Sequence, residues 1–154
     1  MPSISTDQDL RTLLNKLPAE QQRIIGARFA QSMLHLSRDE RVNRAIDTAL
    51  RADATAGELE DAYRAAKAYA TKTYTDCGKD TDWLAQADHF VAAAIAAALT
   101  PDALLTEKTN RAWKAAMQAR MANNCELVEN DADAHTDEVQ RQYAIADEFL
   151  HAAG

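Results

Sequence analysis

One segment near the end of the chain has the spacing of a metal-binding motif. Glu148-x-x-His151 matches the glutamate–histidine motif of di-metal helical bundles. Such a site needs a second copy of the motif and two further inward-facing glutamates. The chain has no second copy, so we expect ordinary surface pairing of Glu148 and His151.

A second segment resembles the start of a calcium-binding loop. Acidic residues alternate along Asp131-x-Asp133-x-His135-x-Asp137. The sixth position of a calcium loop needs glycine for a sharp turn, and the twelfth needs a bidentate glutamate. Here these positions hold Thr136 and Gln142, so we expect an acidic linker and predict no cofactor or metal for the chain.

The remaining histidines and cysteines form no zinc signature. Cys77 and Cys125 stand far apart, and no His-x-x-x-His pair accompanies them. His89 follows Asp88 beside an apolar segment, where we expect a satisfied, partly buried side chain. A general base is the alternative, but it has no evident nucleophile. The sequence therefore does not indicate an enzyme.

Negative charge is concentrated in the second half of the chain. The net charge is −7, and residues 78–154 hold thirteen acidic against six basic side chains. Between residues 126 and 138 there are six acids and no Lys or Arg. We predict that this run forms a docking surface for a basic protein, with simple solubility as the alternative. Its members are Glu126, Glu129, Asp131, Asp133, Asp137 and Glu138.

The elements that must position these residues are all helices. The chain has 33 alanines, four glycines and three prolines, and no alternating strand pattern competes. Capping boxes are expected at Ser37-x-x-Glu40 and Thr55-x-x-Glu58. We predict an all-α single domain, a bundle of about seven helices, near residues 6–16, 18–36, 38–54, 57–77, 81–99, 101–127 and 136–152.

The segment Val91–Leu99 is apolar all round and carries six alanines. A helix without a polar face must be buried on every side. We therefore place this segment at the centre of the bundle. With ten residues from Phe90 on, the apolar stretch is too short to cross a membrane. We expect a protein that binds neither membrane nor nucleic acid and is cytoplasmic.

A helical hairpin appears twice in the chain. Residues 42–50 reappear 49 positions on as 91–99, and residues 62–66 reappear 50 positions on as 112–116. The order and the spacing are both kept, so we predict that 38–77 and 87–127 are duplicated hairpins. Tyr63 and Trp113 are the equivalent aromatic pair. They line either the core, which we favour, or a groove.

The first hairpin also carries a family resemblance. Arg44-Ala45-Ile46-Asp47-Thr48-Ala49-Leu50-Arg51, Gly57-Glu58-Leu59 and Ala62-Tyr63-Arg64-Ala65-Ala66-Lys67-Ala68, with Gln140-Arg141-Gln142-Tyr143 near the end, resemble bacterial immunity proteins of the Imm-5-like type. The resemblance spans about residues 38–150. It implies an alanine-rich helical protein that neutralises a toxin. No binding residue is carried over from that family.

These observations lead to one expectation and two alternatives. We expect a non-enzymatic protein-binding module, an immunity protein whose partner is a basic toxin. The first alternative is a structural protein that associates with itself as a homo-oligomer. The second is a metal protein or enzyme with a site in the bundle core.

Overall fold

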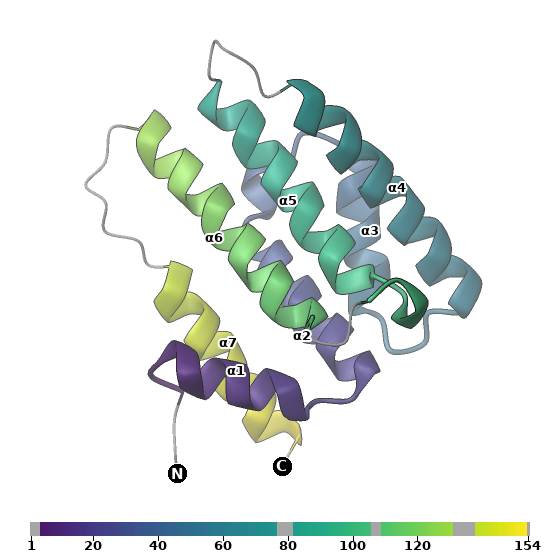
Figure 1. Cartoon of the computed structure of the whole chain (residues 1–154), viewed down its shortest axis with the longest axis vertical. Helices are drawn as coiled ribbons and strands as arrows, with labels where there is room; N and C mark the ends of the chain where they lie inside the picture. The colour runs from purple at the N-terminus through teal and green to yellow at the C-terminus, as the bar shows by residue number, and fades with distance from the viewer. Residues whose placement is uncertain (1–3, 77–81, 106–108, 131–137, 154) are drawn as a thin grey trace.

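The computed structural model describes residues 4–76, 82–105, 109–130 and 138–153. Over these residues the chain is an all-α bundle, as the sequence predicts (Figure 1). The α-helices are α1 (Asp7–Lys16), α2 (Ala19–Gln31), α3 (Glu40–Leu50), α4 (Ala56–Asp76), α5 (Trp83–Leu99), α6 (Arg111–Glu129) and α7 (Glu138–Ala153). Two short 3-10 helices are η1 (Leu34–Leu36) and η2 (Asp102–Leu104).

Helix α5 lies at the centre of the bundle. It runs between α4 and α6, while α2 and α3 pack behind it (Figure 1). From Val91 to Leu99 every residue except the half-buried Ala93 is buried. The prediction of a central apolar helix is therefore confirmed. The outer helices α1 and α7 lie together against α2 and α6.

Gly26 lies where α2 approaches two other helices most closely. A Cβ atom at this position would lie 2.9 Å from the Cβ of Ala98 on α5. It would also lie 3.4 Å from the Cα of Ala112 and from the Cβ of Ala115, both on α6. The absence of a side chain at Gly26 therefore allows the three helices to pack together, which explains a glycine inside a helix.

Two buried arginines bind carbonyl groups at the ends of neighbouring helices. Arg23 on α2 donates from Nε to the carbonyl of Ala49 at 3.0 Å and from Nη2 to that of Arg51 at 2.7 Å. Arg111 at the start of α6 donates from Nε to the carbonyl of Thr100 at 3.1 Å. The last carbonyls of a helix have no partner within it. Each guanidinium therefore joins the end of α3 or α5 to another helix.

One of the two predicted capping boxes forms. The Glu58 N–H donates to Thr55 Oγ1 at 3.1 Å, and the Thr55 N–H donates to Glu58 Oε1 at 2.9 Å, which confirms the box. The box predicted for Ser37 and Glu40 is wrong. Asp39 caps α3 instead, because its Oδ1 accepts the Arg41 N–H at 2.8 Å.

The expected helix over 101–127 is wrong in its first part. Pro101 precedes η2, and α6 begins at Arg111, since Asn110 Oδ1 accepts the N–H groups of Ala112 and Trp113 at 2.9 and 3.0 Å. The α-helix expected over 18–36 ends at Gln31 and is followed by η1. That expected over 38–54 ends at Leu50.

The two predicted hairpins correspond to α3–α4 and α5–α6. Equivalent residues have similar burial: Val42 and Val91 are fully buried, and Ile46 and Ile95 are at most 1% exposed. Helix α5 has 17 residues and α3 has 11, so the hairpins differ in length. The shared burial supports the duplication of 38–77 in 87–127, which stays a proposal.

The two described glycines provide a matched test of the close helix packing. Gly26→Ala should lower the free energy of unfolding by about 1–3 kcal/mol, because the added methyl group forces α2 away from α5. Gly57→Ala, in the first turn of α4, meets only Thr55 Oγ1 at 4.0 Å. It should raise stability by about 0.5 kcal/mol through better helix propensity. Urea unfolding followed by circular dichroism measures both; equal effects would contradict the packing argument.

Candidate functional site

The predicted acidic docking surface is only partly exposed. Glu126 on α6 accepts a hydrogen bond from His35 Nε2 at 2.9 Å and its side chain is 25% exposed. Glu129 is exposed at the end of α6. Asp131, Asp133 and Asp137 lie outside the described residues. Only two of the six predicted docking residues are thus seen at the surface.

Glu138 does not lie on that surface, and its assignment as a docking residue is corrected here. It is fully buried at the start of α7. Its carboxylate accepts hydrogen bonds from Ser32 at 2.9 Å, Arg141 at 2.7 Å and Gln142 at 3.3 Å. Burial raises the pKa of Glu138, while these donors oppose the rise. The sequence showed an acid in an acidic run, but the fold uses it to attach α7 to α2.

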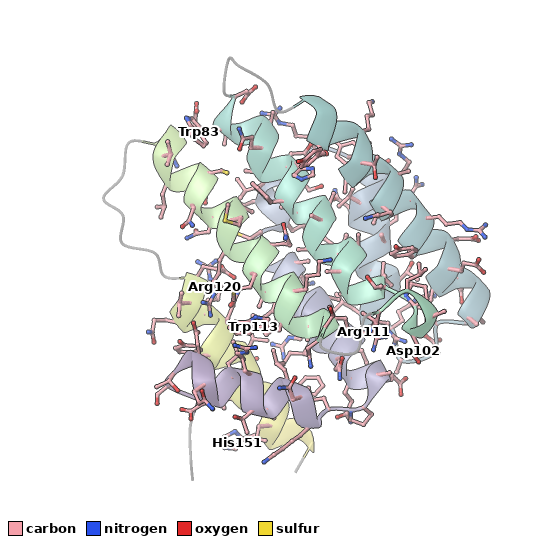
Figure 2. The ribbon with its side chains drawn as sticks, in the orientation of Figure 1. Trp83, Asp102, Arg111, Trp113, Arg120 and His151 are labelled. Carbon is pink, nitrogen blue, oxygen red and sulfur yellow. The ribbon has the colours of Figure 1, made fainter. Side chains whose placement is uncertain are left out.

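The equivalent aromatics Tyr63 and Trp113 have different surroundings. Trp113 lies on the side of α6 that faces α1 and α7 (Figure 2). Its ring has the Arg11 guanidinium 5.0 Å and the Arg120 guanidinium 5.7 Å from its centroid, and it packs on the core. Tyr63 also packs on the core, and in addition it lines a groove. Core packing, which we favoured from the sequence, therefore holds for both rings, and the groove for Tyr63 alone of the two.

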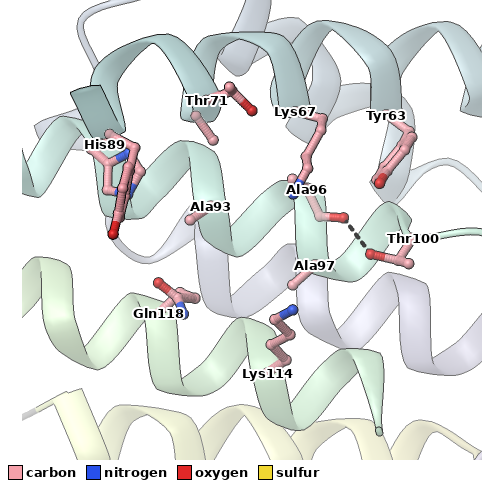
Figure 3. A pocket seen from close by; sticks show the side chains of 12 residues that line it. Tyr63, Lys67, Thr71, His89, Ala93, Ala96, Ala97, Thr100, Lys114 and Gln118 are labelled. Carbon is pink, nitrogen blue, oxygen red and sulfur yellow. Dashed lines mark hydrogen bonds between the residues drawn. The ribbon is translucent and has the colours of Figure 1, made fainter. Parts of the chain in front are cut away.

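This groove runs over α5, between α4 and α6 (Figure 3). We call it the central groove; its volume is about 290 Å³. Its lining comes from α4 (Tyr63, Lys67, Ala70, Thr71 and Tyr74), from α5 and its end (His89, Ala93, Ala96, Ala97 and Thr100) and from α6 (Lys114 and Gln118). Alanines form the floor because α5 has only methyl groups there, too small to fill the space between α4 and α6.

Positive charge enters the central groove from both walls. Lys67 extends from α4 and Lys114 from α6 over the same stretch of α5, beside Gln118 (Figure 3). The described residues that line the groove include no Asp or Glu. Among the described residues neither lysine forms an ion pair. The groove is thus a small basic site in a chain whose net charge is −7.

Aromatic rings stand at the other end of the central groove. The ring centroids of Tyr74 and His89 lie 5.8 Å apart, and Tyr74 is 70% exposed. His89 Nδ1 lies 2.8 Å from Thr73 Oγ1. Burial lowers the pKa of His89, while a hydrogen bond of the ring to the backbone of Ala70 and the Asp88 charge oppose the change.

The Asp88 carboxylate binds groups other than the neighbouring His89. Asp88 is buried, and its oxygens accept the Arg38 N–H at 2.7 Å and the Tyr69 hydroxyl at 2.5 Å. The Asp88 carboxylate and burial raise the pKa of Tyr69. Asp88 therefore ties α4 and the segment before α3 to α5. This agrees with the expectation of satisfied polar groups beside the apolar segment.

The metal-like spacing of Glu148 and His151 has a structural explanation. Glu148 forms an ion pair with Arg28 at 2.5 Å, and His151 Nδ1 donates to the carbonyl of Asp147 at 2.7 Å. Over the described part of the chain, no three His, Cys, Asp or Glu side chains gather as a metal-binding group. The helices described there also include none with the length and apolarity needed to span a membrane.

Comparison of the chain with protein-family models, with curated protein sequences and with solved structures finds no match. The site must therefore be read from its own geometry. Lys67 and Lys114 were not among the residues predicted from the sequence. The sequence does contain an indication for Lys67. It lies on the same face of α4 as Tyr63, Ala70 and Tyr74, which also line the groove.

The lowered pKa of His89 predicts a pH dependence of stability. The unfolded chain takes up a proton near pH 6.5, but the folded chain resists it because the imidazole is buried. The stability present above pH 6.5 is thus lost as the pH falls through the folded pKa. His89→Gln should reduce this loss between pH 7 and about pH 5, measured by urea unfolding. The control His151→Gln, at an exposed site, should leave the decline unchanged; an equally steep decline in His89→Gln would contradict the assignment.

Proposed function

We propose that this protein is a non-enzymatic binding protein and that the central groove binds a ligand with a negative charge and an apolar body. One observation supports this above all: Lys67 and Lys114 line opposite walls above an alanine floor, and the described lining includes no Asp or Glu. Small-molecule sites are typically concave and mostly apolar, with a few polar groups that orient the ligand. The central groove has this composition.

The physical reason is the positive charge that two exposed lysines bring to one groove from opposite walls. An anion between Lys67 and Lys114 gains two charge-assisted hydrogen bonds. The acids elsewhere on the surface act weakly here, because charges are screened over about 10 Å at 0.1 M salt. The local positive charge therefore decides which ligand is preferred.

The expected neutralisation of a toxin is one form of this function and stays a proposal. Of the acidic run, the described residues at the surface are Glu126 and Glu129, and Glu126 pairs with His35. The central groove favours instead a partner that inserts an acidic side chain between Lys67 and Lys114. We therefore place the binding site of the protein in the groove and not on the acidic run.

Two dyes that differ in one charge test the proposal. 8-Anilinonaphthalene-1-sulfonate and N-phenyl-1-naphthylamine share an apolar body, but only the first carries a sulfonate. The protein should bind the sulfonate dye more tightly. Replacing both Lys67 and Lys114 with Ala should weaken its binding about tenfold, roughly the effect of one lost hydrogen bond to a charged group. Fluorescence titration measures both dyes.

The neutral dye should bind the double variant within about twofold of wild type, since the alanine floor is unchanged. Lys16→Ala is the matched control, because Lys16 is an exposed lysine on α1 that does not line the groove. It should leave both affinities unchanged. Sulfonate binding that is equal in wild type and the double variant would refute the proposal.

A further inference from the structure

We propose that the ligand of the central groove is a phosphate monoester that carries a flat aromatic ring, as a mononucleotide does. This inference rests on the proposed function, because it names the chemical class of the anion that the groove binds. Three features of the groove lead to it: the kind of cation, the aromatic end, and the distance between them.

The cations of the central groove are lysines and not arginines. An arginine guanidinium binds the oxygens of carboxylate and phosphate alike through its planar fork. A lysine ammonium is a point charge with three donors, which suits a phosphate with several acceptor oxygens. Lys67 and Lys114 approach from opposite walls, and the amide of Gln118 lies beside them (Figure 3). A dianionic phosphate can bind both ammonium groups at once, whereas a monocarboxylate leaves one charge unbalanced.

The aromatic end of the central groove provides a surface for a ring. Tyr74 is 70% exposed although it is a large aromatic side chain, and it stands beside the His89 ring. Aromatic side chains bind the faces of nucleic-acid bases by stacking. The His89 ring, which bonds to Thr73 and to the backbone of Ala70, also lines this end of the groove.

The spacing of the two ends requires a linker within the ligand. Lys67 and Tyr74 are seven residues apart on α4, which corresponds to about 10 Å along the helix axis. The phosphate and the ring must then be separated by a spacer, as the sugar separates them in a mononucleotide. The floor between them consists of Ala93, Ala96 and Ala97, which let a flat body approach α5 closely. The groove volume of about 290 Å³ is at the lower end of the range for small-molecule sites.

Displacement of the bound sulfonate dye by defined compounds tests this inference. The compounds are adenosine 5′-monophosphate, adenosine without phosphate, ribose 5-phosphate without the ring, inorganic phosphate, and the aromatic carboxylate indole-3-acetate. The monophosphate should displace the dye at a concentration at least tenfold lower than each of the others. Equal displacement by adenosine would overturn the phosphate assignment, and equal displacement by indole-3-acetate would overturn the preference for phosphate over carboxylate. Equal displacement by ribose 5-phosphate or inorganic phosphate would overturn the role of the ring.

Two variants assign the ends of the ligand. Tyr74→Ala should weaken binding of the monophosphate several-fold and leave ribose 5-phosphate unchanged, and Tyr74 is exposed, so the variant should fold as wild type. Replacing Lys67 and Lys114 together with Ala should weaken both compounds, while Lys16→Ala should weaken neither. If the dye binds in a lysine-dependent way but no phosphate compound displaces it, this inference fails and the proposed function stands. If dye binding does not depend on the lysines, both fail.

Discussion

The bundle depends on a central helix, α5, whose buried surface consists largely of alanine. Alanine loses no side-chain entropy on folding and lets helix axes approach closely, but it fills little volume. On one side of α5, the absence of a side chain at Gly26 lets α2 pack against Ala98. On the opposite side, α4 and α6 stand on either flank and no large side chain fills the space between them. The tight packing behind α5 and the central groove in front of it therefore have the same cause.

A chain of polar contacts attaches the outer helices to this apolar centre. Asp7 on α1 accepts two hydrogen bonds from the Arg120 guanidinium and one from the Tyr143 hydroxyl. Arg120 Nε also donates to Gln142, whose amide donates to Glu138. These hydrogen bonds link α1, α6 and α7. The hydrogen bond from Ser32 to Glu138 extends the network to the end of α2. Because every buried member has a partner, the network avoids the cost of burying lone polar groups.

The architecture could be predicted from the sequence because its signals are local or periodic. The helical character, the burial of Val91–Leu99 and the Thr55–Glu58 capping box all follow from composition and spacing. The start of α6 could not be predicted in the same way, since several good helix formers precede the Asn110 cap. The ion pairs between distant residues could not be predicted from the sequence either. Arg120 pairs with Asp7, which is 113 residues away, and such contacts depend on how whole helices pack.

The candidate site was difficult to predict from the sequence because it too depends on how whole helices pack. The acidic run from Glu126 to Glu138 was conspicuous, yet Glu138 is buried, because the position of α7 and not local polarity decides its exposure. Lys67 and Lys114 are 47 residues apart and unremarkable one at a time. They become a pair only when α4 and α6 flank the same helix. A groove built by three helices has no linear motif.

The guanidinium groups at the ends of α3 and α5 divide the molecule into parts with different sensitivity to acid. Arg23 and Arg111 stay protonated at every pH that proteins encounter, and their carbonyl acceptors do not titrate. The attachment of α1 to α6 and α7 includes instead the ionised carboxylate of Asp7, whose pKa the Arg120 guanidinium lowers. This ion pair is lost once the pH falls through the folded pKa of Asp7, and the buried Leu10 and Leu14 then hold α1 on the core. The carbonyl hydrogen bonds at the ends of α3 and α5 do not depend on pH, whereas the ion pair of the outer helices does.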